Sequence, residues 1–222
     1  MSEFGVYVHI PFCRHRCDYC AFATWTDRDH LMVAYVDAVI ADIARAVEKG
    51  MPVADTVFFG GGTPTRLAPE LLASIVNAIP VTSNAEITIE CNPDDVTVEM
   101  MKIYAAAGVN RISMGVQSMV EHVLQSLNRT HDPANVVKAI AAAREGGITS
   151  INLDLIYGVH GESVDDWRTT VEQTIALQPT HISAYGLTVE AGTPLAEDPS
   201  RHPDDDDQAD KYVLADDLFS AA

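Results

Sequence analysis

The sequence has 222 residues, of which 47% are hydrophobic, and this is enough for one domain with a sizeable core. Its formal net charge of −18 argues against a duplex nucleic-acid partner, because the phosphates would be repelled. No apolar run approaches the roughly 18 residues that span a membrane, and the first residues resemble no secretory signal, so we expect a cytoplasmic protein without a transmembrane segment.

Short β-branched runs alternate with longer amphipathic stretches along the chain. The predicted strands are residues 6–10, 56–59, 86–90, 111–116, 151–156 and 181–187. The predicted helices are residues 31–49, 69–79, 97–107, 119–127, 133–145 and 164–177. Pro69 and Pro133 suit first helical turns, and Gly50, Gly108 and Gly146 lie where C-terminal caps are expected.

Six strand–helix units in series predict an α/β protein with a parallel sheet and helices outside it. Because eight such units close a barrel of ~250 residues, six favour an open, partial (β/α)6 barrel of the TIM type. The alternative is a doubly wound sheet.

The amino-acid composition changes after the sixth predicted strand. Residues 188–207 combine three prolines with many acids and predict a loop, and residues 208–222 predict a helix. We therefore expect a barrel over residues 1–190, and over residues 191–222 an acidic loop and helix leading to an absent C-terminal domain. The acids indicate a solvated surface, with an acidic docking surface as the alternative.

Chemically distinctive residues follow the predicted strands or lie near their carboxyl ends. In chain order they are the cysteines of CRHRCDYC, the GGGTP segment, Glu90, Asn92, Gln117, Asp154 and Tyr185. Carboxyl ends of parallel strands meet at one edge, where such folds build their sites. We therefore expect these residues to converge on one mouth.

Three of the four cysteines lie within eight residues in a C-x3-C-x2-C pattern, Cys13, Cys17 and Cys20. In a compartment that keeps thiols reduced, this crowding indicates metal binding. Three thiolates on one loop can hold three corners of a cubane iron–sulfur cluster. A structural zinc site with His9 or His15 as fourth ligand is the alternative, although the usual C-x2-C pairs are absent.

Other residues allow simpler interpretations when each is taken alone. Cys91 reads as a buried small hydrophobe, the glycine run as a tight turn, and Glu90 as a salt-bridged carboxylate. Asp154 lies between apolar residues of a strand, which is costly for a carboxylate unless it is paired, so it has a reason to face a polar pocket.

The cysteine spacing and the segment VYVHIPFCRHRCDYC resemble the radical S-adenosylmethionine (SAM) superfamily. The closest resemblance, from Gly5 to Leu218, is to the branch that contains oxygen-independent coproporphyrinogen III dehydrogenase and the haem chaperones of the HemW type. It implies a [4Fe–4S] cluster on Cys13, Cys17 and Cys20. SAM would bind its fourth iron and be cleaved to a 5′-deoxyadenosyl radical.

The resemblance also implies a SAM pocket. Gly61, Gly62 and Thr63 match the segment that contacts the methionine part of SAM, and Glu90 matches a SAM-binding glutamate. The other matching positions are Tyr7 and Tyr19, which line the site, and Gln117, Arg129 and Asp154, which match a second SAM site.

Two departures bear on the subfamily. Phe22 stands where the dehydrogenase has an additional cysteine, and almost nothing precedes the first strand, where the dehydrogenase has a long extension. Both favour the HemW type, which binds haem and passes it to acceptor proteins. The HNxxYW motif of its C-terminal region is absent, so we expect haem binding only in a longer chain. The alternatives are the dehydrogenase and a non-catalytic iron–sulfur or zinc binding module.

Overall fold

The computed structural model describes residues 4–222, so residues 1–3 of the expected barrel unit lie outside the described part. The strands are β1 (Gly5–Ile10), β2 (Ala54–Gly61), β3 (Val81–Cys91), β4 (Arg111–Gln117), β5 (Ser150–Tyr157) and β6 (His181–Gly186). They form one sheet in chain order, and every neighbouring pair is parallel. This confirms the partial barrel and excludes the doubly wound alternative, in which the strand order reverses.

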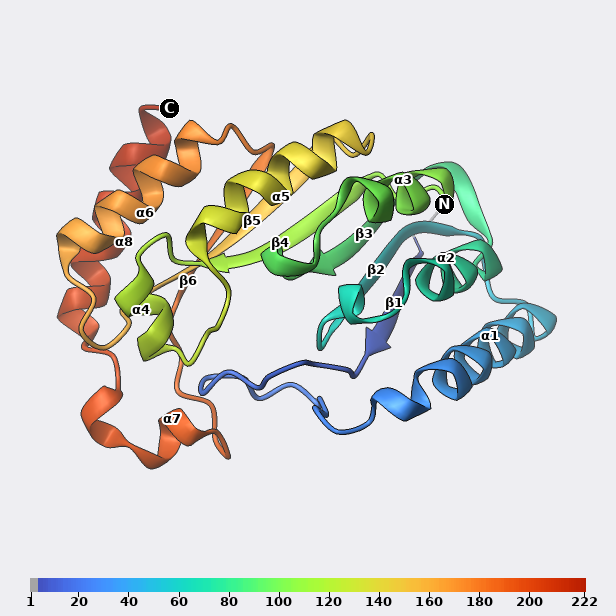
Figure 1. Cartoon of the computed structure of the whole chain (residues 1–222), viewed down its shortest axis with the longest axis horizontal. Helices are drawn as coiled ribbons and strands as arrows, with labels where there is room; N and C mark the ends of the chain where they lie inside the picture. The colour runs from blue at the N-terminus through green and yellow to red at the C-terminus, as the bar shows by residue number, and fades with distance from the viewer. Residues whose placement is uncertain (1–3) are drawn as a thin grey trace.

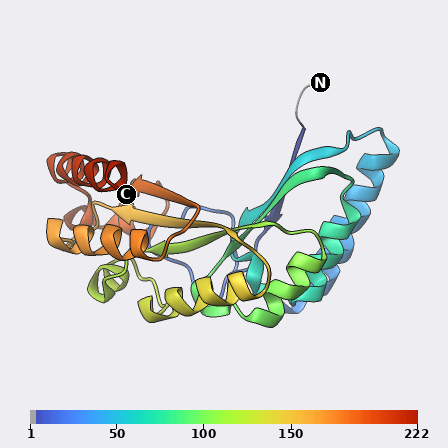
Figure 2. The same cartoon turned by 90° about the horizontal axis from the view of Figure 1, so that it is seen from above.

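Six helices connect successive strands and cover one side of the sheet, and two more follow β6. They are α1 (Met32–Glu48), α2 (Pro69–Ala78), α3 (Val98–Ala106), α4 (Glu121–Ser126), α5 (Pro133–Glu145), α6 (Val164–Ala176), α7 (Pro194–Glu197) and α8 (Asp205–Ser220), with 3-10 turns η1 (Asp29–Leu31), η2 (Pro64–Arg66), η3 (Pro93–Asp95) and η4 (Pro199–Arg201). Figures 1 and 2 show the sheet bent into an open half-barrel, with α1 to α6 along its convex side.

The two faces of the sheet differ because side chains alternate along each strand. The convex face carries the main core, in which Phe59, Ile89 and Leu153 are completely buried under the helices. The concave face is mostly polar, and Glu90, Ser113 and Asp154 lie on it. A closed barrel fills this interior with branched apolar side chains. Here the interior stays open to ligands.

The bounds of β3 and α4 differ from the sequence predictions. β3 begins at Val81, five residues early, because Val81 pairs with Ala54 beyond a register shift. α4 is shorter than predicted, since Val120 keeps an extended backbone and donates its N–H to the Ser118 hydroxyl.

The segment predicted as a loop over residues 188–207 contains α7, η4 and the start of α8. Pro194 and Pro199 each occupy the first turn of a short helix, where a missing N–H costs nothing. Asp204 caps α8 by accepting the N–H of Asp207, so the acids that suggested a loop begin the helix instead.

A second apolar cluster lies apart from the main core. It joins residues of α4, the ends of β5 and β6 and α7, and consists of Val123, Leu127, Ile156, Val159, Leu187 and Leu195. Tyr19, from the cysteine segment, packs against it. The cysteine segment therefore has an apolar base of its own.

Helix α8 packs on α6 through a buried lysine (Figure 1). The Lys211 side chain is 0% exposed, and its Nζ lies 3.1 Å from Glu162 Oε2 and 2.7 Å from Asp207 Oδ2. The indole N–H of Trp167 donates to the Lys211 carbonyl at 2.9 Å. Burial of this charge is tolerable because two carboxylates face it.

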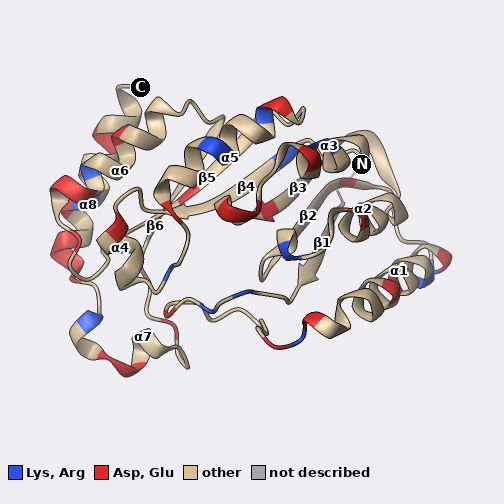
Figure 3. Cartoon of the chain, in the orientation of Figure 1, with Lys and Arg blue, Asp and Glu red and all other residues tan. Residues whose placement is uncertain are grey.

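Acidic residues are spread over α1, α7 and α8, as Figure 3 shows. The first turn of α8 alone carries Asp205, Asp206 and Asp207. Within residues 4–222, no helix is both long and apolar enough to cross a lipid bilayer.

Candidate functional site

One cavity of about 580 Å³ lies on the concave face of the sheet. Its volume is in the range of small-molecule sites, ~300–1,000 Å³. The predicted residues that line it are Cys13, Cys17, Tyr19, Cys20, Gly61, Gly62, Thr63, Glu90, Asn92, Gln117, Arg129, Asp154 and Tyr185. The expectation that the strand ends converge on one mouth is therefore confirmed.

The cavity is lined by charges of both signs, although the chain as a whole is acidic. Five of the 14 lysines and arginines line it, together with four carboxylates, and these are Arg14, Arg16, Arg66, Arg111, Arg129, Glu90, Asp94, Asp95 and Asp154. Such a lining can accept a zwitterionic ligand that carries a further positive charge.

The cysteine segment is fixed by its backbone and by donors to sulfur. The Cys13 N–H donates to the Trp25 carbonyl at 3.0 Å, and the Cys20 N–H donates to the Cys17 carbonyl at 3.2 Å. The Thr63 hydroxyl lies 3.6 Å from Cys13 Sγ, and Arg129 Nη1 lies 3.6 Å from Cys17 Sγ. Donors of this kind stabilise thiolates.

The donor set fits a cluster better than a single ion. Within residues 4–222, no three Cys, His, Asp or Glu side chains form a group that could hold one metal ion. A cubane binds each thiolate through a different iron, so its three ligands need not converge on one point. Burial raises the pKa of the Cys20 thiol, and a bound iron would reverse this by stabilising the thiolate.

His9 is engaged in other contacts. Its Nε2 lies 2.8 Å from the Ala23 carbonyl and its Nδ1 lies 3.0 Å from the Tyr7 hydroxyl. With both ring nitrogens in hydrogen bonds, His9 is not placed to be the fourth zinc ligand of the alternative interpretation. His15 is exposed and lines the cavity.

The glycine segment packs the end of β2 against the chain that enters the cysteine segment. A Cβ on Gly62 would lie 2.7 Å from the carbonyl oxygens of Ile10 and Phe12, and a Cβ on Gly61 would lie 2.4 Å from the His9 ring. Gly61 also has a φ of 107°, which favours glycine. The glycines are thus required by this close packing as well as lining the cavity.

Glu90 lies on β3 and faces the cavity. Its Oε2 accepts the Gly61 N–H at 3.1 Å. Burial raises the pKa of Glu90 to about 7, the Gly61 N–H opposes this rise, and the neighbouring Asp154 adds to it. A cationic ligand would draw this carboxyl into its charged form.

Asp154 belongs to a hydrogen-bond network on β4, β5 and β6. The Ser113 hydroxyl donates to Oδ2 at 2.8 Å and the Asn152 amide donates to Oδ1 at 2.8 Å. The Ser183 hydroxyl donates to Asn152 Oδ1 at 3.1 Å. The carboxylate therefore has a hydrogen-bond donor for each oxygen, as expected for a charged side chain between apolar residues of a strand.

Ser113, Asn152 and Ser183 were not predicted, although one signal was available. Asn152 precedes Asp154 by two residues, and side chains two apart in a strand share a face. Ser183 then lies beside Asp154 by the strand register.

Gln117 and Arg129 meet at the end of β4. Gln117 has a φ of 62°, which is uncommon for a residue with a side chain and typical of functional sites. A Cβ on Gly115 would lie 2.8 Å from Arg129 Nη2 and 3.0 Å from Gln117 Nε2, so this glycine makes room for both side chains.

Arg129 is held from two further sides. Its Nη2 donates to the Gly115 carbonyl at 2.8 Å and its Nε donates to His131 Nδ1 at 3.2 Å. Burial lowers the pKa of His131 to about 4, so the ring is neutral at pH 7 and can accept this bond. The guanidinium is thereby directed at Cys17.

The two predicted tyrosines differ in placement. Tyr7 is 58% exposed and stacks on Phe58, and it is not among the residues that line the cavity. Tyr19 is partly buried between the second apolar cluster and the cavity, and burial raises the pKa of its hydroxyl. Tyr19 thus supports the cysteines from below.

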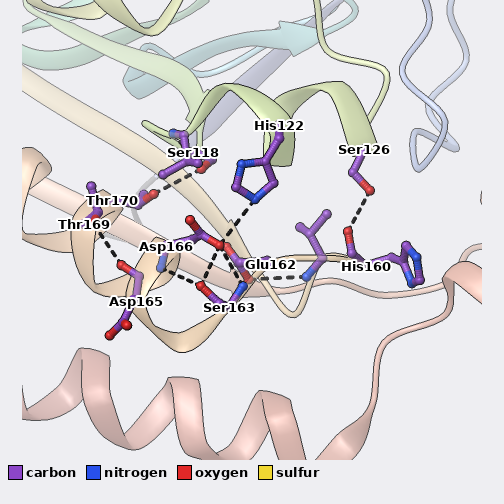
Figure 4. A network of polar contacts seen from close by, with 12 residues as sticks. Ser118, His122, Ser126, His160, Glu162, Ser163, Asp165, Asp166, Thr169 and Thr170 are labelled. Carbon is purple, nitrogen blue, oxygen red and sulfur yellow. Dashed lines mark hydrogen bonds and ion pairs between the residues drawn. The ribbon is translucent and has the colours of Figure 1, made fainter.

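A Ser–Asp–His group between α4, which carries the histidine, and the start of α6 lies outside this site (Figure 4). The Ser163 hydroxyl donates to Asp166 Oδ2 at 2.6 Å, and His122 Nε2 lies 3.3 Å from the same oxygen. The hydrogen bond from Ser163 lowers the pKa of Asp166. Because the carboxylate stands between the serine and the histidine, this is a helix cap rather than a nucleophile with its base.

Comparison with known proteins gives a consistent family. The model of the family described as the radical SAM superfamily matches residues 7–174. A protein named heme chaperone HemW from Mycobacterium tuberculosis is 40% identical over 233 residues, covering 100% of this chain and 60% of the relative. The protein of the same name from Escherichia coli is 36% identical, with 100% and 60% covered.

Among solved structures, the coproporphyrinogen III oxidase HemN from Escherichia coli, described as a radical SAM enzyme, superimposes with a TM-score of 0.89 at 27% identity. The match covers 99% of this chain and 52% of that one. The chain thus spans about three fifths of the length of the two curated relatives described here.

Proposed function

Because the chain belongs to the radical SAM superfamily, we propose that it is the barrel portion of a haem chaperone of the HemW type. In this proposal Cys13, Cys17 and Cys20 hold a [4Fe–4S] cluster and the cavity holds SAM. Haem binds in the longer protein and is passed to acceptor proteins. The observation that carries the proposal is the set of three thiols on one wall of a cavity of about 580 Å³.

The cluster would supply one electron to cleave a carbon–sulfur bond of SAM, through the iron that no cysteine binds. The chain supplies the contacts that hold the thiolates in place. Thr63 and Arg129 donate to the sulfurs, and Tyr19 packs beneath them. These contacts fix where the thiolates lie before any ligand arrives.

The polar lining would then bind and orient SAM. Glu90 offers a carboxylate to its positive charges, and Gly61, Gly62 and Thr63 lie beside its methionine part. Gln117, Arg129 and Asp154 would serve a second SAM molecule.

The haem assignment rests on two observations. The relatives named HemW match the whole of this chain. Phe22 is 62% exposed at the cavity, where the dehydrogenase resemblance calls for a further cysteine. An apolar ring cannot act as a thiol, so this position disfavours dehydrogenase chemistry.

The competing function is oxidative decarboxylation of coproporphyrinogen III, and the structural match to HemN is the observation that favours it. The test is anaerobic incubation of the reconstituted chain with coproporphyrinogen III, SAM and a reductant, followed by mass spectrometry. Escherichia coli HemN is the positive control. We expect iron and sulfide in the protein but no decarboxylated product.

A haem titration followed by absorption spectroscopy completes the test, with the Mycobacterium tuberculosis relative alongside. We expect the relative to bind haem and the 222-residue chain to bind it more weakly. Protoporphyrinogen formation would establish the dehydrogenase instead. Zinc without sulfide would leave only a structural metal module.

A further inference from the structure

Asp18 lies between Cys17 and Cys20 and contacts two distant parts of the chain. Its Oδ2 accepts a hydrogen bond from Arg201 Nη1 at 2.8 Å, and the two residues are 183 positions apart in the sequence. Its Oδ1 accepts a hydrogen bond from Asn128 Nδ2 at 2.8 Å. Both carboxylate oxygens are therefore occupied, and both partners come from outside the cysteine segment.

The backbone of Asp18 is held as firmly as its side chain. Its N–H donates to the Leu127 carbonyl at 3.3 Å, and its carbonyl accepts the Leu195 N–H at 3.1 Å. One residue of the cysteine segment thus joins the end of α4 to α7.

Arg201 completes the connection. Its Nη2 donates to the Ser126 carbonyl at 2.6 Å, so the same guanidinium spans Asp18 and the last turn of α4. The exposed fractions of the two side chains are 24% for Arg201 and 18% for Asp18. At this burial, an ion pair is worth more than one between fully exposed side chains, and the second Arg201 nitrogen is held by the Ser126 carbonyl.

The second apolar cluster lies directly behind these polar contacts. Leu127 and Leu195, whose backbones bond to Asp18, are both members of it, and Tyr19 packs against it. Polar and apolar contacts therefore act on the same two residues between Cys17 and Cys20.

We propose that the Asp18–Arg201 ion pair positions Cys17 and Cys20 for the cluster, so that residues 187–202, hereafter the strap, form part of the cluster site. The proposal rests on the proposed function. Asp18 and Arg201 are positioning residues, because neither carries a cluster ligand. Fixing the cysteines before iron binds reduces the loss of conformational entropy that accompanies binding.

The first experiment needs no cluster. In the cluster-free, reduced chain, the rate of iodoacetamide labelling of each cysteine is followed by mass spectrometry. We expect Asp18→Ala and Arg201→Ala to label Cys17 and Cys20 about tenfold faster, the effect of losing a charge-assisted hydrogen bond. Buried Cys91, in the main core, should label at the same rate in every variant.

The second experiment uses the reconstituted chain. Iron loss to a chelator should be about tenfold faster in both single variants and no faster still in the double variant, because the pair acts as one unit. The electron paramagnetic resonance spectrum of the reduced cluster should change on Asp18→Ala, with and without SAM. Arg201→Lys, which keeps the charge, should restore part of the wild-type behaviour.

Arg168→Ala is the matched control, since Arg168 pairs with Glu172 at 3.8 Å on the exposed face of α6, away from the cysteines. Labelling, iron loss and spectrum should stay as in the wild type. Labelling rates of Cys17 unchanged by Asp18→Ala would overturn the inference. If the wild type itself takes up no iron and sulfide, the proposed function fails, while the labelling result still decides whether the pair positions the cysteines.

Discussion

At the scale of single residues, Glu90 is subject to two opposed effects. Burial favours its protonated form, whereas a cationic ligand would favour its ionised form. Burial holds its pKa near 7, above the ordinary value of 4.5. Between these two values the folded chain binds more protons than the unfolded chain, so the free energy of unfolding falls as the pH rises through this window. An ionised Glu90 is thus a cost to the ligand-free chain that a cationic ligand would remove.

We therefore expect Glu90→Gln to stabilise the ligand-free chain at pH 8 by about 1–3 kcal/mol and to leave its stability at pH 4 unchanged. Urea unfolding at both pH values measures this. Glu86→Gln, at an exposed position of the same strand, is the control and should have no effect at either pH. Equal stability of Glu90→Gln and the wild type at pH 8 would show that this carboxyl is well solvated.

Asp154 is expected to contribute to SAM binding rather than to iron binding. In the reconstituted chain, Asp154→Ala should weaken SAM binding by about tenfold or more while iron content stays the same, because hydrogen bonds to a charged group are worth ~1.5–3 kcal/mol. Isothermal calorimetry and iron analysis give the two quantities. Ser150→Ala, at the other end of β5, is the control, and an unchanged SAM affinity in Asp154→Ala would remove this residue from the pocket.

At the scale of elements, α8 is attached to the barrel by a buried charge. Glu162 Oε2 accepts the N–H of Gly158 at 2.9 Å as well as facing Lys211. Burial raises the pKa of Glu162 and Lys211 opposes this rise. The loop after β5 and the helix α8 are therefore electrostatically dependent on one another.

Lys211→Met should destabilise the chain by about 3–5 kcal/mol, because it leaves Glu162 buried without a counter-charge. Adding Glu162→Gln to this variant should recover much of the loss. Denaturant unfolding of the single and double variants measures both effects, with Arg168→Ala as an exposed control. A single variant that unfolds at the wild-type denaturant concentration would contradict a structural role for this pair.

These elements also show what the sequence could and could not predict. The strands and main helices were predictable because apolar periodicity and Pro or Gly boundaries are local signals. The convergence of Glu90, Gln117 and Asp154 followed from the geometry of parallel strands. In contrast, Lys211 lies in a stretch rich in acids without an apolar stripe, so nothing local indicated that its side chain is buried.

The contacts of Asp18 were equally hidden, because its partner lies 183 residues away in a segment read as a loop. The placement of Tyr7 depends on the tertiary contacts with Phe58 and His9, which no strand pattern specifies. Pairwise contacts across long sequence separations are thus the part of the site that sequence reasoning did not reach.

At the scale of the whole molecule, the cysteines lie beside the main core rather than in it. Cys17→Ala should therefore abolish cluster assembly and change stability by less than about 2 kcal/mol. Iron and sulfide analysis measures the first effect, and a circular-dichroism melt of the cluster-free chain measures the second. Cys91→Ala is the converse control, since Cys91 lies in the main core, and it should lower stability and keep the cluster. Loss of the cooperative melt in Cys17→Ala would mean that the thiol supports the barrel.

The ion pair between Asp18 and Arg201 has a consequence for biosynthesis. Because 183 residues separate the two, a ribosome adding ~5–20 residues per second needs about 10–40 s between them. For most of that interval the cysteines have been made and the strap has not. Iron that reached them then would meet an unfinished site, so the order of synthesis favours cluster delivery after the barrel has been completed.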